Sequence, residues 1–349
     1  MKFSLTLAAA ALLGLATACS KDASPAPPTA SNSPAATTAT AFAYGADTSW
    51  MTQMEAEGKK FYNNSGTQQD LLTILKGKGI TAVRLRVWVN PSGGWCNTND
   101  LVAKAKRATA AGLGVMVDFH YSDVWADPAH QTKPAAWAGQ TTSQLYKSVY
   151  DFTLNTLNTL KTAGVTPTWV QIGNETSDGM LWQDGRASVS ATNFQNFAYM
   201  INSGRNAAKA VFPATKVIVH IANGENNTTA RWLFDGLRAN GANWDVCGFS
   251  VYPSTTNWAS INNQVLYNMQ DMAARYGKEV MICEAGMSVA ATTTCKSFLA
   301  DLITKTKSVP GGLGVFYWEP EAYSNWQGYT MGAFDTTGRP TVAMDAFIH

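Results

Sequence analysis

From residue 43 onward, the chain repeats one pattern eight times: a short apolar run, rich in β-branched residues, followed by a longer segment with helical spacing. Continuous apolar strands joined by helices indicate a parallel sheet whose two faces are both covered. Eight strand–helix units are the number at which such a sheet closes into a barrel. The predicted strands lie at 43–48, 81–88, 113–121, 168–173, 215–222, 245–252, 279–284 and 312–318, and helical patterns lie between them and at 341–348.

We therefore predict an α/β fold, a single (β/α)8 TIM barrel over 43–349. The alternative is an open, doubly wound sheet. That fold usually carries a glycine-rich phosphate loop after its first strand, and the sequence contains neither GxGxxG nor GxxxxGK.

Composition narrows the function of this barrel. Charged residues make up 14% of the 349 residues, the formal net charge is +2, and Lys and Arg form no stripe, so a nucleic-acid binder is excluded. Twelve Trp and twelve Tyr exceed what a core of this size needs. Aromatic faces stack on the apolar faces of sugar rings, so the excess favours a carbohydrate ligand over ordinary core and surface positions.

The N-terminal segment has the pattern of an export signal. Lys2 precedes an apolar run at 5–16, and small residues at 16–18 form a cleavage site, which predicts a signal peptide over 1–18. Cys19 follows directly, as in a lipobox, so we expect lipidation at Cys19 and a membrane-anchored lipoprotein at the cell surface or in the periplasm. Plain secretion is the alternative. Residues 20–42 are mostly Ala, Pro, Ser and Thr, which predicts a flexible linker.

Barrel enzymes carry their chemistry at the carboxyl ends of the strands. Polar and aromatic side chains gather at those positions in this sequence and not in the helical segments. As substrate-binding candidates we select Asp47, Trp88, His120, Asp123, Trp125, Asp127, His220 and Trp318. For His120 and Trp318 a simple core role is the competing interpretation, and Asp127 is also suited to capping a turn before Pro128.

Two glutamates end apolar runs, Glu175 after the fourth predicted strand and Glu284 on the seventh. A carboxylate at the end of a buried strand is costly unless it is paired or used. Two carboxyl groups facing each other across a barrel mouth are the machinery of glycoside hydrolysis, one as nucleophile and one as acid and base. We therefore predict that Glu284 is the nucleophile and Glu175 the general acid.

Three neighbours are expected to support this pair. A positive charge from Arg84 and a hydrogen bond from the Tyr252 hydroxyl would keep Glu284 ionised. Asn174 would bind the sugar 2-hydroxyl. Strict alternation along the strand turns Asn174 away from the cavity, so this role requires a bulge or a twist at the strand end.

The sequence says less about the state of the cysteines and about the binding partners of the protein. Cys96, Cys247, Cys283 and Cys295 match no zinc pattern, and either disulfides or buried thiols fit an exported chain. No cofactor is expected. The predicted partners are a polysaccharide and, through the lipid anchor, the outer envelope membrane, and we expect a monomer.

At these residues the chain closely resembles the arabinogalactan endo-β-1,4-galactanases, glycoside hydrolase family 53. The most specific segment is Asp118-Phe119-His120-Tyr121-Ser122-Asp123, followed by Trp125-Ala126-Asp127-Pro128. Further segments are Gly45-Ala46-Asp47-Thr48-Ser49, Val83-Arg84-Leu85-Arg86-Val87-Trp88, Ile172-Gly173-Asn174-Glu175, Ser250-Val251-Tyr252-Pro253 and Phe316-Tyr317-Trp318-Glu319-Pro320. The resemblance spans about 43–349.

The resemblance implies endo-acting hydrolysis of β-1,4-galactan with retention of configuration, with Glu175 as proton donor and Glu284 as nucleophile. Some relatives bind structural calcium in the last loops; no acidic cluster is evident there, so we expect no metal. The chain departs from the family pattern at Thr176, at Ala222 before Asn223-Gly224, and at Ala285 after Glu284. Two alternatives remain: a retaining β-glycanase of the same clan acting on mannan or glucan, and a surface lipoprotein that binds glycan without cleaving it.

Overall fold

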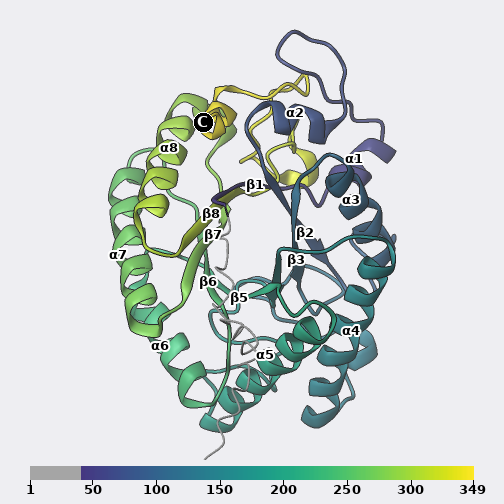
Figure 1. Ribbon diagram of the computed structural model, residues 1–349, viewed down its shortest axis with the longest axis vertical. Coiled ribbons are helices and arrows are strands. Elements are labelled where there is room, and N and C mark those ends of the chain that lie inside the picture. Colours follow the sequence, from purple (N-terminus) through teal and green to yellow (C-terminus); the bar gives the residue numbers. More distant parts are fainter. Residues whose placement is uncertain (1–40) are drawn as a thin grey trace, which may run out of the picture. The chain divides into compact units, whose positions relative to one another are not determined.

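The computed structural model describes residues 41–349. The predicted signal peptide, Cys19 and nearly all of the linker lie outside the described residues. Eight strands pair in sequence order, all parallel, and β8 closes back onto β1. Figure 1 shows the helices arranged around these strands. The predicted TIM barrel is confirmed.

The strand bounds lie within two residues of the predicted ones. They are β1 Ala43–Asp47, β2 Ala82–Val87, β3 Gly114–Phe119, β4 Trp169–Ile172, β5 Lys216–Ile221, β6 Val246–Val251, β7 Glu279–Ala285 and β8 Gly312–Tyr317. The helices are α1 Met51–Ala56, α2 Leu71–Gly77, α3 Thr98–Ala110, α4 Thr142–Thr162, α5 Ala191–Val211, α6 Asn227–Ala239, α7 Trp258–Tyr276 and α8 Thr292–Ser308. Short 3₁₀ helices are η1 Ala135–Trp137, η2 Val289–Ala291, η3 Trp326–Gly328 and η4 Val342–Phe347.

Two elements differ from the sequence prediction. The short helix α1 was not expected, and the segment predicted as a last helix at 341–348 is the 3₁₀ helix η4. The Thr341 hydroxyl caps η4 by accepting the Ala343 N–H, and Phe347 is fully buried. The last strand–helix unit therefore ends in a short 3₁₀ helix whose apolar side chains pack against the barrel, and not in a long α-helix.

Helix ends follow the sequence signals. Thr141 and Gln144 form a capping box at the start of α4, each side chain bonding to the other's backbone N–H. Asn97 and Ser190 cap α3 and α5 in the same way, each with its side chain accepting the N–H three residues on. These caps fix where each helix starts, and so the length of the preceding loops at the barrel mouth.

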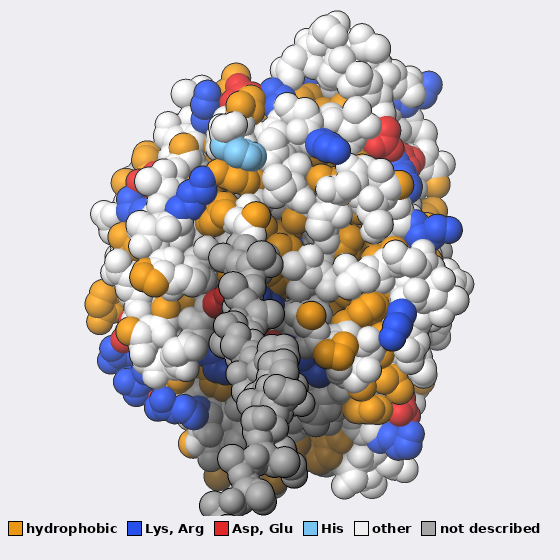
Figure 2. Space-filling model, in the orientation of Figure 1, with side chains coloured by type: hydrophobic (Ala, Val, Ile, Leu, Met, Phe, Trp, Pro, Cys, Tyr) orange, Lys and Arg blue, Asp and Glu red, His pale blue; other side chains and the backbone are white. Residues whose placement is uncertain are grey.

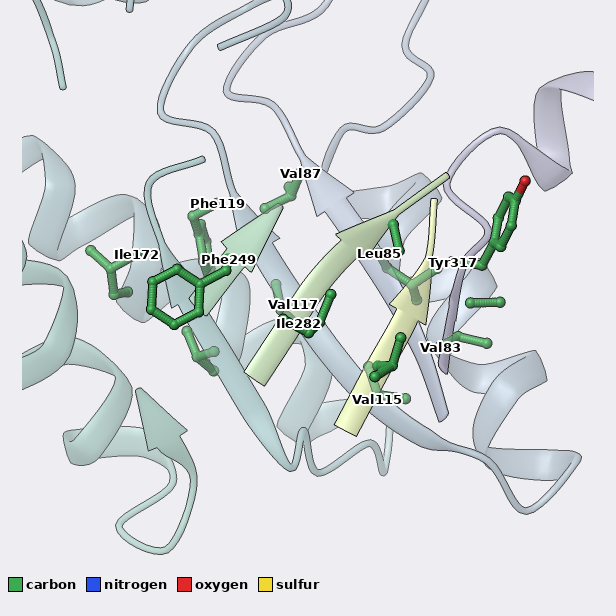
Figure 3. Close-up of a cluster of buried hydrophobic side chains, with 14 of the residues drawn as sticks. Val83, Leu85, Val87, Val115, Val117, Phe119, Ile172, Phe249, Ile282 and Tyr317 are labelled. Atoms are coloured by element: carbon green, nitrogen blue, oxygen red, sulfur yellow. The ribbon is translucent and has the colours of Figure 1, made fainter. Parts of the chain in front are cut away.

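The outer face of the barrel is an apolar layer between strands and helices. Figure 3 shows this layer, in which every second side chain of a strand points to the helices. On β2 these are Val83, Leu85 and Val87, and on β3 Val115, Val117 and Phe119. The intervening side chains of the same strands face the barrel interior.

The interior is filled at the bottom and polar at the top. A buried apolar cluster closes the lower barrel, formed by Ala43, Ala82, Met116, Trp169, Ile218, Val246, Met281, Cys283, Leu313 and Phe316. Gly45 belongs to this packing, because a Cβ there would lie 2.1 Å from the Phe316 ring. Above the cluster the inward positions become Arg84, Arg86, Asp118, Gln171 and His220. Apolar side chains therefore close the lower interior of the barrel, and a layer of polar side chains, which we call the polar floor, lies above them. The candidate site lies on this polar layer.

The surface formed by residues 41–349 carries charges of both signs. Figure 2 shows charged side chains scattered among neutral and hydrophobic ones on the face in view. Several pair across neighbouring helices, as Arg275 does with Asp235 and Arg231 with Asp271. Within 41–349, no helix combines the length and the apolar character needed to cross a bilayer.

Candidate active site

Arg84 is the centre of the polar floor. It is fully buried on β2, and its guanidinium pairs with Asp47 at 2.7 Å, with Asp118 at 2.8 Å and with Glu284 at 2.8 Å. It also donates to Asn174 Oδ1 at 2.8 Å and to Gln171 Oε1 at 3.2 Å. These acceptors come from strands β1, β3, β7 and the end of β4. One guanidinium therefore fixes four strand ends relative to one another.

A bulge in β7 directs Glu284 into the barrel. Consecutive β6 residues Phe249 and Ser250 pair with Ile282 and Glu284, so Cys283 is an extra residue on β7. Met281 and Cys283 already face the interior, and strict alternation would turn Glu284 toward the helices. With the bulge, the Glu284 carboxylate meets Arg84 and accepts a 2.9 Å hydrogen bond from the Tyr252 hydroxyl.

A left-handed turn directs Asn174 and Glu175. The strand β4 ends at Ile172, and Gly173 has a φ of +82°. A Cβ at this position would also lie 2.5 Å from Thr176 Cγ2, so glycine is required twice over. Asn174 then points inward, with its amide donating to Ala126 O at 2.8 Å and its carbonyl oxygen accepting from Arg84. The twist that the role of Asn174 required is present.

Glu175 lies half-buried beside His220 and Ser250. Its backbone N–H donates to Nδ1 of His220 at 3.3 Å, and Nε2 of the same ring hydrogen-bonds Ser250 Oγ at 2.9 Å. The Ser250 hydroxyl in turn bonds the Glu175 carboxyl. Burial holds the pKa of His220 well below its usual value, with Arg84 acting in the same direction, so this imidazole is neutral.

The two glutamates line one cavity of about 380 Å³. Its other walls come from His120, Trp125, Ala126, Asp127, Asn174, Tyr252, Trp318, Tyr329 and Met331. Glu175 reaches this cavity from the end of β4 and Glu284 from β7. The two carboxyl groups therefore share one cavity at the barrel mouth.

The electrostatics make the two glutamates a coupled pair. Burial raises the pKa of Glu284 to about 8 although Arg84 opposes it, and the charge of Glu175 adds to the increase. Burial also raises the pKa of Glu175, against the Ser250 hydrogen bond. Arg84 lowers the pKa of Glu284, as the sequence suggested, but burial and the nearby carboxylates outweigh this effect, so the net shift is upward. Since adjacent carboxyls titrate together, the raised pKa belongs to the pair, which keeps one proton at neutral pH.

A second cavity of about 450 Å³ continues from the first. The two share Trp125, Trp318 and Tyr329. The second cavity is otherwise lined by Trp50, Gln53, Trp88, Ser92, Trp95, Gln327 and Gly328. The tryptophans pack edge to face, for example Trp88 against Trp125 with ring centroids 5.1 Å apart. We call this second space the aromatic cavity.

The structure places three of the predicted substrate contacts outside the two cavities. Asp47 is fully buried, and its carboxylate is occupied by Arg84 and by the backbone and hydroxyl of Ser49. His220 is buried behind Glu175 and Ser250. Asp123 accepts the backbone N–H groups of Asn90 and Ala135, so it joins two loops. None of the three lines either cavity, because local hydrogen bonds within the protein already use their polar atoms.

The remaining candidates do line the cavities. His120 has both roles that the sequence left open: it lines the first cavity, and its ring is buried between Asp118 at 2.9 Å and the Ala126 N–H at 3.2 Å. Asp127 lines the same cavity while capping the turn at Ala129 and His130. Trp88, Trp125 and Trp318 form cavity walls.

Several cavity residues were missed from the sequence. Tyr329 and Met331 come from the long segment after β8, and Trp50 and Trp95 from loops after β1 and β2. Gln171, which bonds Asp118 at 2.5 Å and accepts from Arg84, was missed on β4. An inward position on β4 was the available signal for Gln171; loop residues such as Tyr329 carry no such periodicity.

The described residues also bear on metals and cysteines. Across 41–349, no three His, Cys, Asp or Glu side chains are grouped so as to hold a metal ion. In the same part of the chain Cys96, Cys247, Cys283 and Cys295 are buried free thiols, so the disulfide alternative is not the one found among them.

A (β/α)8 barrel with two facing glutamates at the end of β4 and on β7, above a buried arginine and beside an aromatic cavity, has the architecture of a glycoside hydrolase. The model of glycosyl hydrolase family 53 matches residues 43–347. The chain belongs to this family and is a glycoside hydrolase.

Similar proteins agree with this assignment. An arabinogalactan endo-β-1,4-galactanase of Thermothelomyces thermophilus is 36% identical over 299 residues, which cover 79% of this chain and 88% of the relative. A fungal β-1,4-galactanase structure superposes with a TM-score of 0.81 at 33% identity and covers 88% of this chain and 100% of that one. The family 53 catalytic domain of Ignisphaera aggregans gives 0.78 at 29% identity, with 88% and 95% covered.

Proposed function

We propose that this glycoside hydrolase is an endo-β-1,4-galactanase that cleaves galactan with retention of configuration through Glu175 and Glu284. The substrate follows from the similar galactanases, one of which shares 36% of its aligned residues with this chain. The observation that carries the mechanism is the asymmetry of the carboxyl pair. Glu284 is bound by a guanidinium and a phenol, whereas Glu175 has only the Ser250 hydroxyl.

This asymmetry assigns the two roles. The single proton of the pair resides on Glu175, because both Glu284 oxygens accept hydrogen bonds, from Arg84 and from Tyr252. Ionised Glu284 attacks the anomeric carbon while Glu175 gives its proton to the departing glycosidic oxygen. Once the glycosyl ester forms, the negative charge of Glu284 is gone. Glu175, now ionised, takes a proton from the water that hydrolyses the ester.

Asn174 is placed to bind the sugar 2-hydroxyl. Its amide nitrogen uses one hydrogen on Ala126 O, and the second remains for a ligand in the cavity that it lines. The hydrogen bond from Arg84 to its carbonyl oxygen fixes the amide orientation. Such a contact strengthens as positive charge develops at the anomeric carbon, so it stabilises the transition state more than the bound substrate.

The aromatic cavity supports an endo mode of action. It leads away from the catalytic cavity past Trp125 and Trp318 toward Trp50, Trp88 and Trp95, on the side of β1 and β2. Glu175, which protonates the leaving group, lies at the end of β4 and does not line it. Further sugars on the glycone side of the cleaved bond would therefore stack on these rings, and a chain is cut internally.

The substrate and stereochemistry are tested together. Purified protein is incubated with linear β-1,4-galactan, mannan and cellulose, and released reducing ends are measured. We expect galactan to be hydrolysed fastest, with the product anomer observed first by NMR being β. Faster release from mannan or glucan would overturn the substrate assignment, and α product would overturn retention. Binding without release from any of the three would support the non-catalytic alternative.

The pH profile provides a separate prediction. Burial raises the pKa of Glu175, so kcat/KM on galactan should fall on an alkaline limb that lies above the ordinary carboxyl range, where Glu175 loses the proton that it donates. In Glu175→Gln that alkaline limb should disappear, because glutamine does not titrate. Initial rates at low substrate concentration across a pH series measure this. A wild-type kcat/KM that stays constant well above pH 8 would contradict the assignment of the proton.

A further inference from the structure

A second pair of carboxyls lies behind the aromatic cavity and has no part in the mechanism above. Glu319 and Glu321 follow β8, and both side chains are fully buried. Around the barrel mouth they join buried Asp47, Asp118 and Glu284, so five buried carboxyls face two buried guanidiniums, Arg84 and Arg86. Arg84 is already shared by three of the five. Burial of unpaired negative charge is very costly, so protons must compensate for part of it.

Glu319 is the better satisfied member of this second pair. One carboxylate oxygen pairs with Arg86, and the other accepts the Trp50 N–H at 3.1 Å. Its backbone is left-handed, with a φ of +46°. A side chain is strained in that conformation, and the two bonds to β2 and to the end of β1 hold it there.

Glu321 has no comparable partners. Both of its oxygens are buried, and among the described residues neither accepts a hydrogen bond of ordinary geometry from another residue. Its carboxyl is in hydrogen-bonding contact with that of Glu319. Two carboxylates repel at this separation, whereas a carboxylic acid and a carboxylate form a strong hydrogen bond. The other titratable groups facing it are Asp47 on β1 and Tyr329 after η3, and neither brings positive charge.

Arg86 connects this pair to the aromatic cavity. Its guanidinium carbon lies 4.3 Å from the ring centroid of Trp125 and 5.2 Å from those of Trp50 and Trp88. Its Nε and Nη2 are buried and have no hydrogen-bond partner in the described chain, and the three indoles pack against the guanidinium. All three rings line the aromatic cavity. The position of Arg86 therefore sets the position of that wall.

We propose that Glu321 is a neutral carboxylic acid at neutral pH and that, by donating its proton to Glu319, it positions Arg86 under the tryptophans of the aromatic cavity. Glu321 touches no substrate and is a positioning residue. The effect on substrate binding rests on the proposed galactanase function, whereas the protonation of Glu321 does not.

The protonation has a consequence for stability. Burial raises the pKa of Glu321 well above its usual value, and the charge of Glu319 acts in the same direction. Between the ordinary carboxyl pKa and the raised one, the unfolded chain has released this proton and the folded protein has not. The folded state therefore loses stability as the pH rises through that window. Glutamine at position 321 keeps an N–H hydrogen-bond donor and does not titrate. The Glu321→Gln variant should therefore not lose stability in this way.

The first experiment measures melting temperatures of wild type, Glu321→Gln and the control Glu57→Gln from pH 4.5 to pH 8. Glu57 is exposed, on the C-terminal side of α1. As the pH rises, we expect the melting temperature of Glu321→Gln to increase relative to that of wild type by roughly 2 °C for each pH unit. The melting temperature of Glu57→Gln should follow that of wild type. A difference that does not change with pH, or a Glu321→Gln that becomes less stable than wild type as pH rises, would overturn the neutral acid.

The second experiment separates positioning from folding. Glu321→Met has a similar volume and no donor, so KM on galactan should rise roughly fivefold, as expected for one lost hydrogen bond, with kcat little changed. Glu321→Gln should restore KM. Equal KM in Glu321→Met and wild type would remove the positioning role. If the protein proves inactive on galactan, calorimetric affinity for galactan oligosaccharides replaces KM.

A spectroscopic measurement covers the case in which the Glu321 variants do not fold. In a background with both Glu175→Gln and Glu284→Gln, which lacks both catalytic carboxyls, infrared spectra at pH 7 should still contain the carbonyl stretch of a buried carboxylic acid. Absence of that band would overturn the proposal whatever the state of the variants or the identity of the substrate.

Discussion

Glu284→Gln should lower kcat on galactan by roughly 10⁴-fold or more while leaving the protein folded and able to bind galactan. The amide is not a nucleophile, so the glycosyl ester does not form. Its shape matches the carboxylate, and the Tyr252 hydroxyl still has an oxygen to bond at this position. Arg84 keeps Asp47 and Asp118 as partners when Glu284 loses its charge, so the melting temperature should not fall sharply. Initial rates and thermal unfolding measure the two effects.

A second glutamate on β7 provides the control variant for Glu284→Gln. Glu279 begins β7, is partly exposed and pairs with Lys216 at 2.5 Å at the opposite end of the barrel. Glu279→Gln should keep kcat within about twofold, since surface ion pairs contribute little. Glu284→Ala with azide gives a further check. Azide fills the space of the lost carboxylate and attacks the anomeric carbon, so an α-glycosyl azide should accumulate. Unchanged turnover in Glu284→Gln would remove the nucleophile assignment.

Arg84→Met should cause the largest loss of stability of any single substitution in the barrel floor. It leaves Asp47 and Asp118 buried without their guanidinium, and removing one partner of a buried ion pair typically costs about 3–5 kcal/mol. The pKa of Asp118 is held below its usual value in spite of burial, chiefly by Arg84 and then by His120. Without Arg84 that pKa should rise, so the variant's deficit in free energy of unfolding should grow from acid toward neutral pH.

Chemical denaturation at pH 5 and pH 7 measures this effect. Arg107 provides the matched control, because it also pairs with two carboxylates, Glu55 and Asp70, but its side chain is one-third exposed. Arg107→Met should cost about 1 kcal/mol or less. Equal losses in the two variants would mean that the buried network around Arg84 contributes no more than a surface pair.

The strands and the two glutamates were predictable because they depend on local patterns. A β-branched apolar run identifies a strand wherever it lies, and polar residues at eight successive strand ends meet at one barrel mouth. Glu175 and Glu284 could be selected because each interrupts an apolar run. Trp88, Trp125 and Trp318 could be selected because they are aromatic at strand ends or in the loops that follow.

The inward direction of Glu284 was not readable, since it depends on an extra residue in β7 relative to β6. Nor was the difference between Asp47, which is buried beneath Arg84, and Asp127, which faces the cavity. Both are aspartates near strand ends, and what separates them is whether a partner elsewhere in the chain occupies the carboxylate. Tyr329 was missed for a related reason, because it enters the cavity from a long irregular segment with no periodic signal.

The extra residue in β7 has a consequence for how such barrels diverge. The aim of the nucleophile is set by the length of the strand, so substitutions at Cys283 leave it in place while a one-residue deletion between Met281 and Glu284 would rotate it out among the helices. Gains and losses of single codons in this stretch are therefore far more damaging than point changes. Any alignment or redesign that treats β7 as a regular ladder would assign the nucleophile to the wrong side of the barrel wall.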